Sequence, residues 1–367
     1  MDSSTGHRGG ALHPFANARE ERPHADAQPS RRQRIFAALA IAILAGGWTY
    51  LSLRLRGDWV WAADFTYPWL AARAVWKGVD AYAFVAQAHP PFGPWLLYPL
   101  PAALVTLPIA WLPMRTAASV GVGASCGLLA FSVTRTAFWP LLMFVSAPAM
   151  RLADSVQIWP PIFTAAAFWA PGLGLLAAKP NFALPIIAFQ TRLRSVVIGA
   201  VVGITIVGLS FIVDQHWLAR WIAIVRDSPP SAQFRPPMLR AAGCFLVLSV
   251  LRWRRPEGRL LFCMALVPQT AYFYDQLPLL LIPGTRRQMV VYAFVSQIAA
   301  LLAPVSTDVR PLYVIAGLYL PALIMLLLRP NEGPAPVWLE QMASRTPRWL
   351  AGRPSRAKAS PQASFDD

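Results

Sequence analysis

The sequence has 367 residues, of which 56% are hydrophobic and only 14% are charged, and the apolar residues form long blocks. Blocks of this kind exclude an ordinary soluble domain, in which polar residues interrupt the apolar ones along every helix or strand. Lys and Arg outnumber Asp and Glu by 33 to 17, but this excess falls mostly between the blocks. We therefore attribute the basic charge to membrane topology and anionic lipid, and expect no nucleic-acid partner.

The chain divides into an apolar middle and two polar ends. Residues 1–34 and 331–367 lack periodicity and are rich in Pro and Arg, which predicts disordered cytoplasmic tails in contact with membrane lipid at most. Residues 35–330 predict an all-α polytopic membrane protein, because a bilayer is crossed by about 20 apolar residues in a helix. The apolar blocks lie near 35–53, 95–113, 116–134, 137–152, 158–177, 181–190, 195–213, 239–252, 259–274, 276–285, 289–304 and 311–328.

These blocks predict about 10 to 12 transmembrane helices in the cell membrane, which we take to be a bacterial cytoplasmic membrane. Arg31, Arg32 and Arg34 precede the first block, so the positive-inside rule places the N-terminus in the cytoplasm, and the C-terminus follows. One crossing per block then places Arg115 and the arginine clusters of the later loops inside as well. The sequence carries no signal for an oligomeric state.

The same count predicts two outer loops, 54–93 and 214–238, which hold five of the nine acidic residues between the tails. Asp275 and Asp308 also fall on the outer side, whereas Asp154 and Glu257 are the exceptions and fall on the inner side. Any chemistry that uses carboxylates is therefore expected on the outer face of the membrane.

Neither a metal nor a nucleotide cofactor is predicted. The cysteines lie singly inside apolar blocks, and the histidines show no ligand spacing. The pair Gly121-x-Gly123 also lies in an apolar block, where small residues permit close packing of helices.

The first outer loop is expected to carry interfacial helices. Trp69, Ala72, Val75 and Trp76 recur at helical spacing, which is typical of a helix that lies on the membrane surface. Asp64 precedes this helix and has two interpretations. It caps the free backbone N–H groups of the helix, the commoner role, or it is a carboxylate that accepts a proton at the membrane surface.

Several short motifs follow one another in a fixed order along roughly residues 35–330. They are Asp64-Phe65-x-Tyr67, Ala71-Ala72-Arg73, Lys77-Gly78-x-Asp80-Ala81-Tyr82, Tyr98-Pro99-Leu100-Pro101 with Leu107-Pro108 and Leu112-Pro113, Lys179-Pro180-Asn181 and Tyr274-Asp275-Gln276. In their order and spacing these motifs resemble glycosyltransferase family 87, the polyprenyl-phosphate-mannose-dependent membrane mannosyltransferases with the C-type glycosyltransferase fold. Two positions depart from the family pattern: Asp154-Ser155-Val156-Gln157 replaces Gly-Gln, and Tyr98-Pro99-Leu100 replaces Tyr-Pro-Pro.

The resemblance implies that Asp64 is the general base of a sugar transfer with inversion, from a polyprenyl-phosphate donor and without a metal. Asp58 lies in the same loop and is the runner-up, although Arg54 and Arg56 are close enough in sequence to pair with it. The candidates for binding the donor phosphate are Lys179, Arg73, Lys77 and Arg220. The candidates for substrate binding are Tyr67, His89, Tyr274, Asp275 and Gln276.

Each candidate cation has a structural alternative. Lys179 interrupts two apolar blocks and either snorkels to the interface or binds a ligand. Arg73 and Lys77 suit lipid phosphates in general, and Arg220 lies among tryptophans that are typical of the interfacial belt. Asp275 orients an acceptor or, more simply, pairs with an outer arginine.

Together these features predict an integral membrane glycosyltransferase, most plausibly a mannosyltransferase, that acts on a glycolipid or polysaccharide acceptor outside the membrane. The alternative is a multi-pass transporter or flippase for a lipid or small solute, and a non-catalytic scaffold is a third possibility. The depth of the charged residues in the membrane distinguishes the glycosyltransferase from the transporter, since a transporter needs charges midway along its transmembrane helices.

Overall fold

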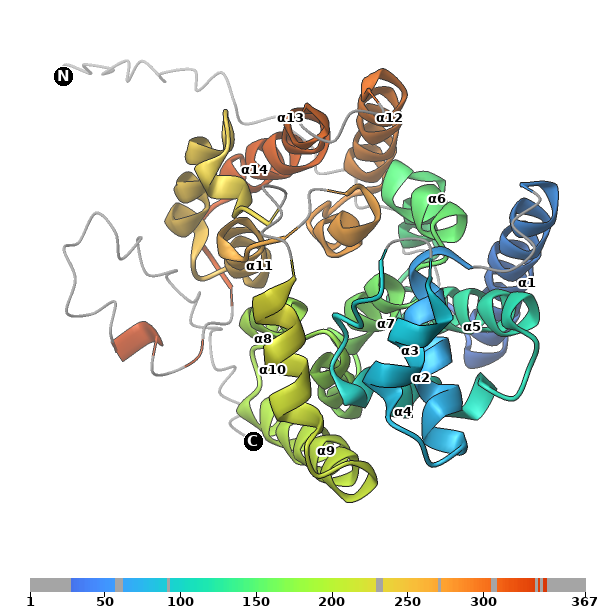
Figure 1. The fold of residues 1–367 in the computed structure, drawn as a ribbon. Helices are drawn as coiled ribbons and strands as arrows, with labels where there is room; N and C mark the ends of the chain where they lie inside the picture. Colours follow the sequence, from blue (N-terminus) through green and yellow to red (C-terminus); the bar gives the residue numbers. More distant parts are fainter. Residues whose placement is uncertain are drawn as a thin grey trace, which may run out of the picture.

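The chain folds as a bundle of helices, several of them short (Figure 1). The computed structural model describes residues 28–56, 62–90, 93–228, 234–269, 272–304, 309–333, 336 and 339–341. Within these residues every extended regular element is a helix, and a single isolated bridge joins Arg235 to Gln269. The predicted all-α class is therefore confirmed, and the apolar surfaces of the helices agree with a helical membrane protein.

The α-helices are α1 (Arg31–Leu55), α2 (Thr66–Trp76), α3 (Ala81–Ala88), α4 (Leu100–Thr106), α5 (Met114–Val133), α6 (Ala147–Asp154), α7 (Trp159–Ala166), α8 (Ala183–Phe189), α9 (Leu193–Val213), α10 (Trp217–Asp227), α11 (Pro256–Leu266), α12 (Arg286–Leu302), α13 (Arg310–Val314) and α14 (Leu320–Leu327). The 3-10 helices are η1 (Ala63–Phe65), η2 (Leu107–Ile109), η3 (Trp139–Val145), η4 (Ala170–Ala178), η5 (Pro180–Phe182), η6 (Pro237–Leu239), η7 (Gly243–Arg252) and η8 (Tyr274–Leu281). One π-helical turn, η9 (Ile315–Tyr319), joins α13 to α14.

Four helical stretches among the described residues are long and apolar enough to cross a membrane: 31–55, 114–133, 193–213 and 310–327. The other predicted blocks form short helices or pairs of short helices, because prolines and 3-10 turns interrupt them. The count of 10 to 12 crossings therefore stays a prediction.

Helices α1 and α5 pack side by side and antiparallel (Figure 1). The guanidinium of Arg34 donates to the carbonyl of Phe131 over 2.7 Å, and Ser119 donates to the carbonyl of Gly46 over 2.7 Å. A Cβ on Gly123 would lie 2.7 Å from the carbonyl oxygen of Ala42, so the missing side chain lets the two backbones touch. The predicted close packing at this glycine is confirmed.

The start of α5 lies at the same end of the bundle as the first loop. Thr66 bonds the sulfur of Met114 over 3.8 Å, and the indole of Trp69 donates to the carbonyl of Leu112 over 3.3 Å. Because α1 and α5 are antiparallel, the end of α1 and the start of α5 lie at the same end of the bundle. The prediction that block 95–113 crosses the membrane, with Arg115 inside, is therefore wrong. That block instead breaks into α4 and η2 at Leu107-Pro108.

Asp154 also lies at the end where α1 finishes. It accepts a hydrogen bond from Trp48 over 3.0 Å and pairs with Arg56 at 3.4 Å. The prediction that Asp154 faces the other side is wrong. Block 137–152 is not one helix but η3 and α6, which meet at Ser146.

Helix α2 is mostly buried and packs against α3 and α4. The expectation that it lies on the membrane surface is wrong for most of its length. Apolar side chains surround this helix, so it buries all faces in the protein, and only its last residue, Trp76, and the following Lys77 are exposed.

The C-terminal end of α14 is held by arginines. Arg252 donates to the carbonyls of Leu327 and Arg329 over 2.7 and 2.5 Å, and Arg255 donates to that of Pro330 over 2.7 Å. These cations satisfy carbonyl groups at the end of α14 that have no partner inside the helix.

Candidate functional site

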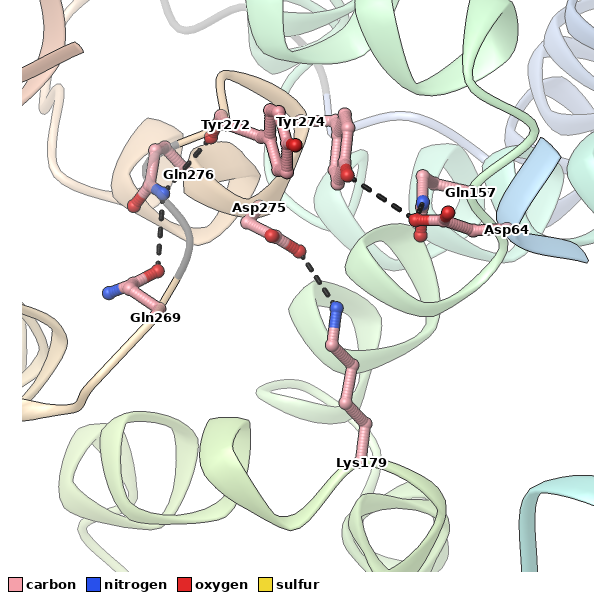
Figure 2. Close-up of polar contacts among 8 residues, drawn as sticks. All are labelled: Asp64, Gln157, Lys179, Gln269, Tyr272, Tyr274, Asp275 and Gln276. Atoms are coloured by element: carbon pink, nitrogen blue, oxygen red, sulfur yellow. Dashed lines mark hydrogen bonds and ion pairs between the residues drawn. The ribbon is translucent and has the colours of Figure 1, made fainter. Parts of the chain in front are cut away.

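Four segments that are far apart in the sequence meet at one point of the bundle (Figure 2). Asp64 comes from η1, Gln157 from the turn before α7, and Lys179 from the junction of η4 and η5. Tyr274 and Asp275 come from the first turn of η8. We call these five residues the Asp64 cluster.

Asp64 is partly exposed and is held by two neighbours. The amide nitrogen of Gln157 donates to Oδ2 of Asp64, and the hydroxyl of Tyr274 donates to the same oxygen over 3.3 Å. No described residue bonds Oδ1, and neither η1 nor α2 has a side-chain cap. The interpretation of Asp64 as a helix cap is therefore wrong, and Oδ1 is the oxygen that can accept a proton.

Burial is the largest influence on the pKa of the Asp64 carboxyl and raises it above its ordinary value. The positive charge of Lys179 and the hydrogen bonds from Gln157 and Tyr274 act in the opposite direction, while Asp275 adds to the rise. A carboxylate whose pKa is raised is a stronger base than one in water, and raised carboxyl pKa values are common where proteins carry out acid–base chemistry.

Lys179 and Asp275 form a buried ion pair beside Asp64 (Figure 2). Their Nζ–Oδ1 distance is 2.9 Å, and the side chains are 19% and 4% exposed. Lys179 also lies 5.0 Å from the centre of the Phe182 ring, in a cation–π contact. Lys179 therefore points into the protein rather than snorkelling, and Asp275 takes the pairing role, with a lysine instead of an arginine.

The backbone is strained on both sides of the bond between Asp64 and Gln157. Ala63 and Val156, the residues directly before them, have φ angles of 46° and 52°. L-residues rarely adopt this left-handed conformation, and a β-branched valine least of all. Such strain is typical of functional sites, where the surrounding packing holds it in place.

Residues 158–178 form a hairpin that starts and ends at the Asp64 cluster. Gln157 precedes α7 and Lys179 follows η4, and the two helices pack against each other. At the turn between them, the carbonyl of Ala167 accepts a hydrogen bond from Gln190 over 2.9 Å. The prediction that block 158–177 is one crossing is wrong, because the chain reverses after Phe168.

Gln276 points away from Asp64 into a buried polar network. Its amide nitrogen donates to the side chain of Gln269 and to the carbonyl of Tyr272, each over 3.1 Å. Its oxygen accepts from the hydroxyl of Tyr319 over 2.6 Å. Since Gln276 is fully buried and its amide is used within the protein, its geometry suits holding η8 in place rather than the predicted substrate contact.

The remaining predicted site residues lie outside the cluster. Arg220 pairs with Asp214 and Asp80 at 2.8 and 2.9 Å and so ties α10 to the first loop. The hydroxyl of Tyr67 donates to the carbonyl of Gly93 over 3.1 Å.

The last three predicted residues are engaged in local contacts. Arg73 stacks over Trp69 at 4.8 Å, and Lys77 over Phe84 at 4.9 Å. The ring of His89 bonds the carbonyl of Gln87 over 2.7 Å. Asp58, the runner-up base, lies outside the described residues.

In the part of the chain that the structure describes, no three His, Cys, Asp or Glu side chains gather as they would around a metal ion. No protein-family model, curated protein or solved structure matches this chain.

Sequence reasoning missed Gln157, Gln269 and Tyr319. Gln157 lies in a motif that departs from the family pattern, and only the contact with Asp64 gives it a role. Tyr319 and Gln269 lie in or beside apolar blocks. A single polar residue there is a signal in itself, because it needs a hydrogen-bond partner inside the protein.

Proposed function

We propose that this chain is an integral membrane glycosyltransferase that moves a sugar, most plausibly mannose, from a polyprenyl-phosphate donor to a glycolipid or polysaccharide hydroxyl. The observation that carries this proposal is the meeting of Asp64, Gln157, Lys179, Tyr274 and Asp275 at one point. It brings a partly exposed carboxylate of raised pKa next to a buried cation.

The chemistry assigns Oδ1 of Asp64 the role of general base. It takes the proton of the acceptor hydroxyl while the acceptor oxygen attacks the anomeric carbon of the donor sugar. The bond from that carbon to the phosphate oxygen breaks, and the electron pair leaves with the polyprenyl phosphate. Attack opposite the leaving group inverts the anomeric centre. A base in this position contributes about 10²- to 10⁴-fold in rate.

The bonds from Gln157 and Tyr274 suit this role because both hold Oδ2. They orient the carboxylate and leave Oδ1 for the acceptor. Lys179 supplies positive charge beside the reaction, as a leaving phosphate requires. Asp275 holds the ammonium of Lys179 in place over 2.9 Å.

The resemblance to glycosyltransferase family 87 supports the same assignment. Its motifs around Asp64, Lys179 and Tyr274-Asp275 are separated by about a hundred residues along the chain, yet their side chains gather in one cluster. Short motifs that arise by chance have no reason to meet in space. The donor class and the preference for mannose come from this resemblance.

The test is transfer of a radiolabelled sugar from polyprenyl-phosphate mannose, glucose and arabinose to extracted membrane lipids. We expect the purified wild type to be active and Asp64→Asn to lose about 10²- to 10⁴-fold. Asp227→Asn is the matched control, since Asp227 is exposed and pairs only locally with Arg226. Equal activity of Asp64→Asn and wild type would refute the role of the base, and an inactive wild type with all three donors would refute the enzyme.

A transporter is the second candidate, and the buried Lys179–Asp275 pair favours it, because transporters place such charges inside the bundle. The two functions differ in what vesicles would accumulate. A transporter moves labelled sugar lipid between leaflets with its covalent structure unchanged, whereas the transferase yields a new glycoside and free polyprenyl phosphate.

A further inference from the structure

The charges of the Asp64 cluster do not balance a bound phosphate. With Asp64 ionised, two carboxylates, Asp64 and Asp275, surround one ammonium group, that of Lys179. The cluster therefore carries a net negative charge before the donor binds. A donor phosphodiester adds one negative charge, and the leaving phosphomonoester carries more. A further cation is needed on the side where the donor phosphate lies.

Three of the cations predicted for this role lie outside the Asp64 cluster. Arg220 is neutralised by Asp80 and Asp214. Arg73 lies over Trp69 and Lys77 over Phe84, and neither ring belongs to the Asp64 cluster.

Arg310 is linked to Asp64 through two stacked tyrosines. Its guanidinium lies 5.3 Å from the centre of the Tyr272 ring and shares a side-chain hydrogen bond with that residue. The rings of Tyr272 and Tyr274 stack with their centres 5.2 Å apart and their planes 17° from parallel. The hydroxyl of Tyr274 then reaches Asp64. Figure 2 shows the two tyrosine rings side by side, with Tyr274 turned toward Asp64.

A guanidinium that lies over an aromatic ring is suited to binding phosphate. The stacking contact uses its flat face, while its N–H donors project from the edge in a rigid fork. Such a fork matches two phosphate oxygens at once. Arg310 is half-buried, and its contact with Tyr272 holds the guanidinium beside that ring.

We infer that Arg310, held by Tyr272, binds the phosphate of the lipid-linked donor, a phosphate ester of a long-chain alcohol. This inference rests on the proposed function for the identity of the donor. Tyr272 and Tyr274 separate the phosphate at Arg310 from the base at Asp64, so in this arrangement the sugar lies along the edges of the two rings. Tyr272 is a positioning residue in this arrangement.

The test measures binding without transfer. Farnesyl phosphate, farnesol and inorganic phosphate are titrated into the purified full-length protein in detergent, and binding is followed by thermal stabilisation and by equilibrium dialysis of labelled ligand. We expect wild type to bind farnesyl phosphate roughly 10- to 100-fold more tightly than farnesol, as charge-assisted hydrogen bonds allow. Arg310→Gln should lose this preference, and Arg310→Lys should keep part of it.

Arg226→Gln is the matched control, because Arg226 is exposed and pairs with its neighbour Asp227. It should retain the full preference for the phosphate. The inference is overturned if folded Arg310→Gln still prefers farnesyl phosphate as wild type does, or if wild type shows no preference for the phosphate over the alcohol. Equal binding of inorganic phosphate would overturn the assignment to a lipid ester. Because the binding assay contains neither a sugar nor an acceptor, a wild type that prefers farnesyl phosphate but transfers no sugar would refute the proposed function and leave this inference standing.

Discussion

Removing one member of the Lys179–Asp275 pair should destabilise the fold far more than removing both. The carboxylate of Asp275 is 4% exposed and lies 2.9 Å from the ammonium of Lys179. Loss of one partner from a buried pair costs about 3–5 kcal/mol, because the remaining charge stays in a poorly solvated site. Replacement of both partners by apolar residues of similar size is often neutral or stabilising.

The two single variants should not be equivalent. Lys179→Met leaves the more deeply buried group, Asp275, without its ammonium partner, so we expect a cost near the upper end of that range. Asp275→Leu leaves Lys179, whose side chain is 19% exposed and keeps its contact with Phe182. A lysine also reaches water more easily through its flexible stem. We expect this variant to lose roughly half as much as Lys179→Met.

Thermal unfolding in detergent of the four proteins of this double-mutant cycle measures the effect. At about 2 °C per kcal/mol for a chain of this size, Lys179→Met should unfold about 10 °C below wild type. The double variant Lys179→Met/Asp275→Leu should unfold within a few degrees of wild type. If the double variant instead shows the sum of the two single losses, the residues are uncoupled and the ion pair does not stabilise the fold.

Three further outcomes follow from the same contacts. Asp64→Asn should melt at a higher temperature than wild type at neutral pH, because burial raises the pKa of Asp64 and makes its ionised form destabilising. This difference in melting temperature should shrink as the pH falls and the wild-type carboxylate becomes protonated. A difference that stays the same across pH would show that burial of Asp64 does not destabilise its ionised form. Sugar transfer should decline on acidification at a pH above the ordinary carboxyl pKa of about 4. Gln157→Met removes a donor to the ionised carboxylate and should move that decline to still higher pH. A pH profile that does not move in this variant would exclude Asp64 as the titrating base. Gly123→Val should cost about 1–3 kcal/mol by pushing α1 from α5, whereas Gly47→Ala, where a Cβ meets nothing within 4 Å, should leave the melting temperature nearly unchanged.

The membrane character and the charged residues of the cluster were predictable from composition alone. Blocks of apolar residues identify helices such as α1 and α9, and a lysine or aspartate between such blocks is expensive enough to require a partner. This reasoning singled out Lys179 and Asp275 separately. It did not pair them, because 96 residues separate them in the sequence and no local pattern links their segments.

The path of the chain was harder to predict because apolar length does not reveal direction. The block at 158–177 is long enough for one crossing, yet it folds as a hairpin with α7 and η4 as its arms. The interruption comes from Trp169-Ala170-Pro171, where proline cannot continue a helix. The assumption of one crossing per apolar block made the chain change sides of the membrane at every block. That assumption misplaced Asp154 and Arg115. The contacts of α1 with α5 and α6 corrected both.

The uncharged members of the site had the weakest signals. Gln157 is a neutral residue in a short turn, and nothing in its spacing connects it to Asp64. Its amide oxygen is buried without a hydrogen-bond partner among the described residues, which is a property of the fold and not of the sequence. Only the positive φ of Val156 and the contact with the carboxylate identify this turn as part of the site.

Three costly features coincide at the Asp64 cluster. One is a carboxylate whose pKa is raised by burial, another is a buried ion pair, and the third is a strained backbone at Ala63 and Val156. The buried carboxylate and the strained backbone lower the stability of the fold. The ion pair could be replaced by apolar residues of similar size without loss of stability. A scaffold protein would gain by losing all three, since a helical bundle packs better with leucine and alanine at such positions. Their presence at one point, among residues from four separate segments, supports the proposed role of Asp64 in chemistry, because the stability of the fold does not require them.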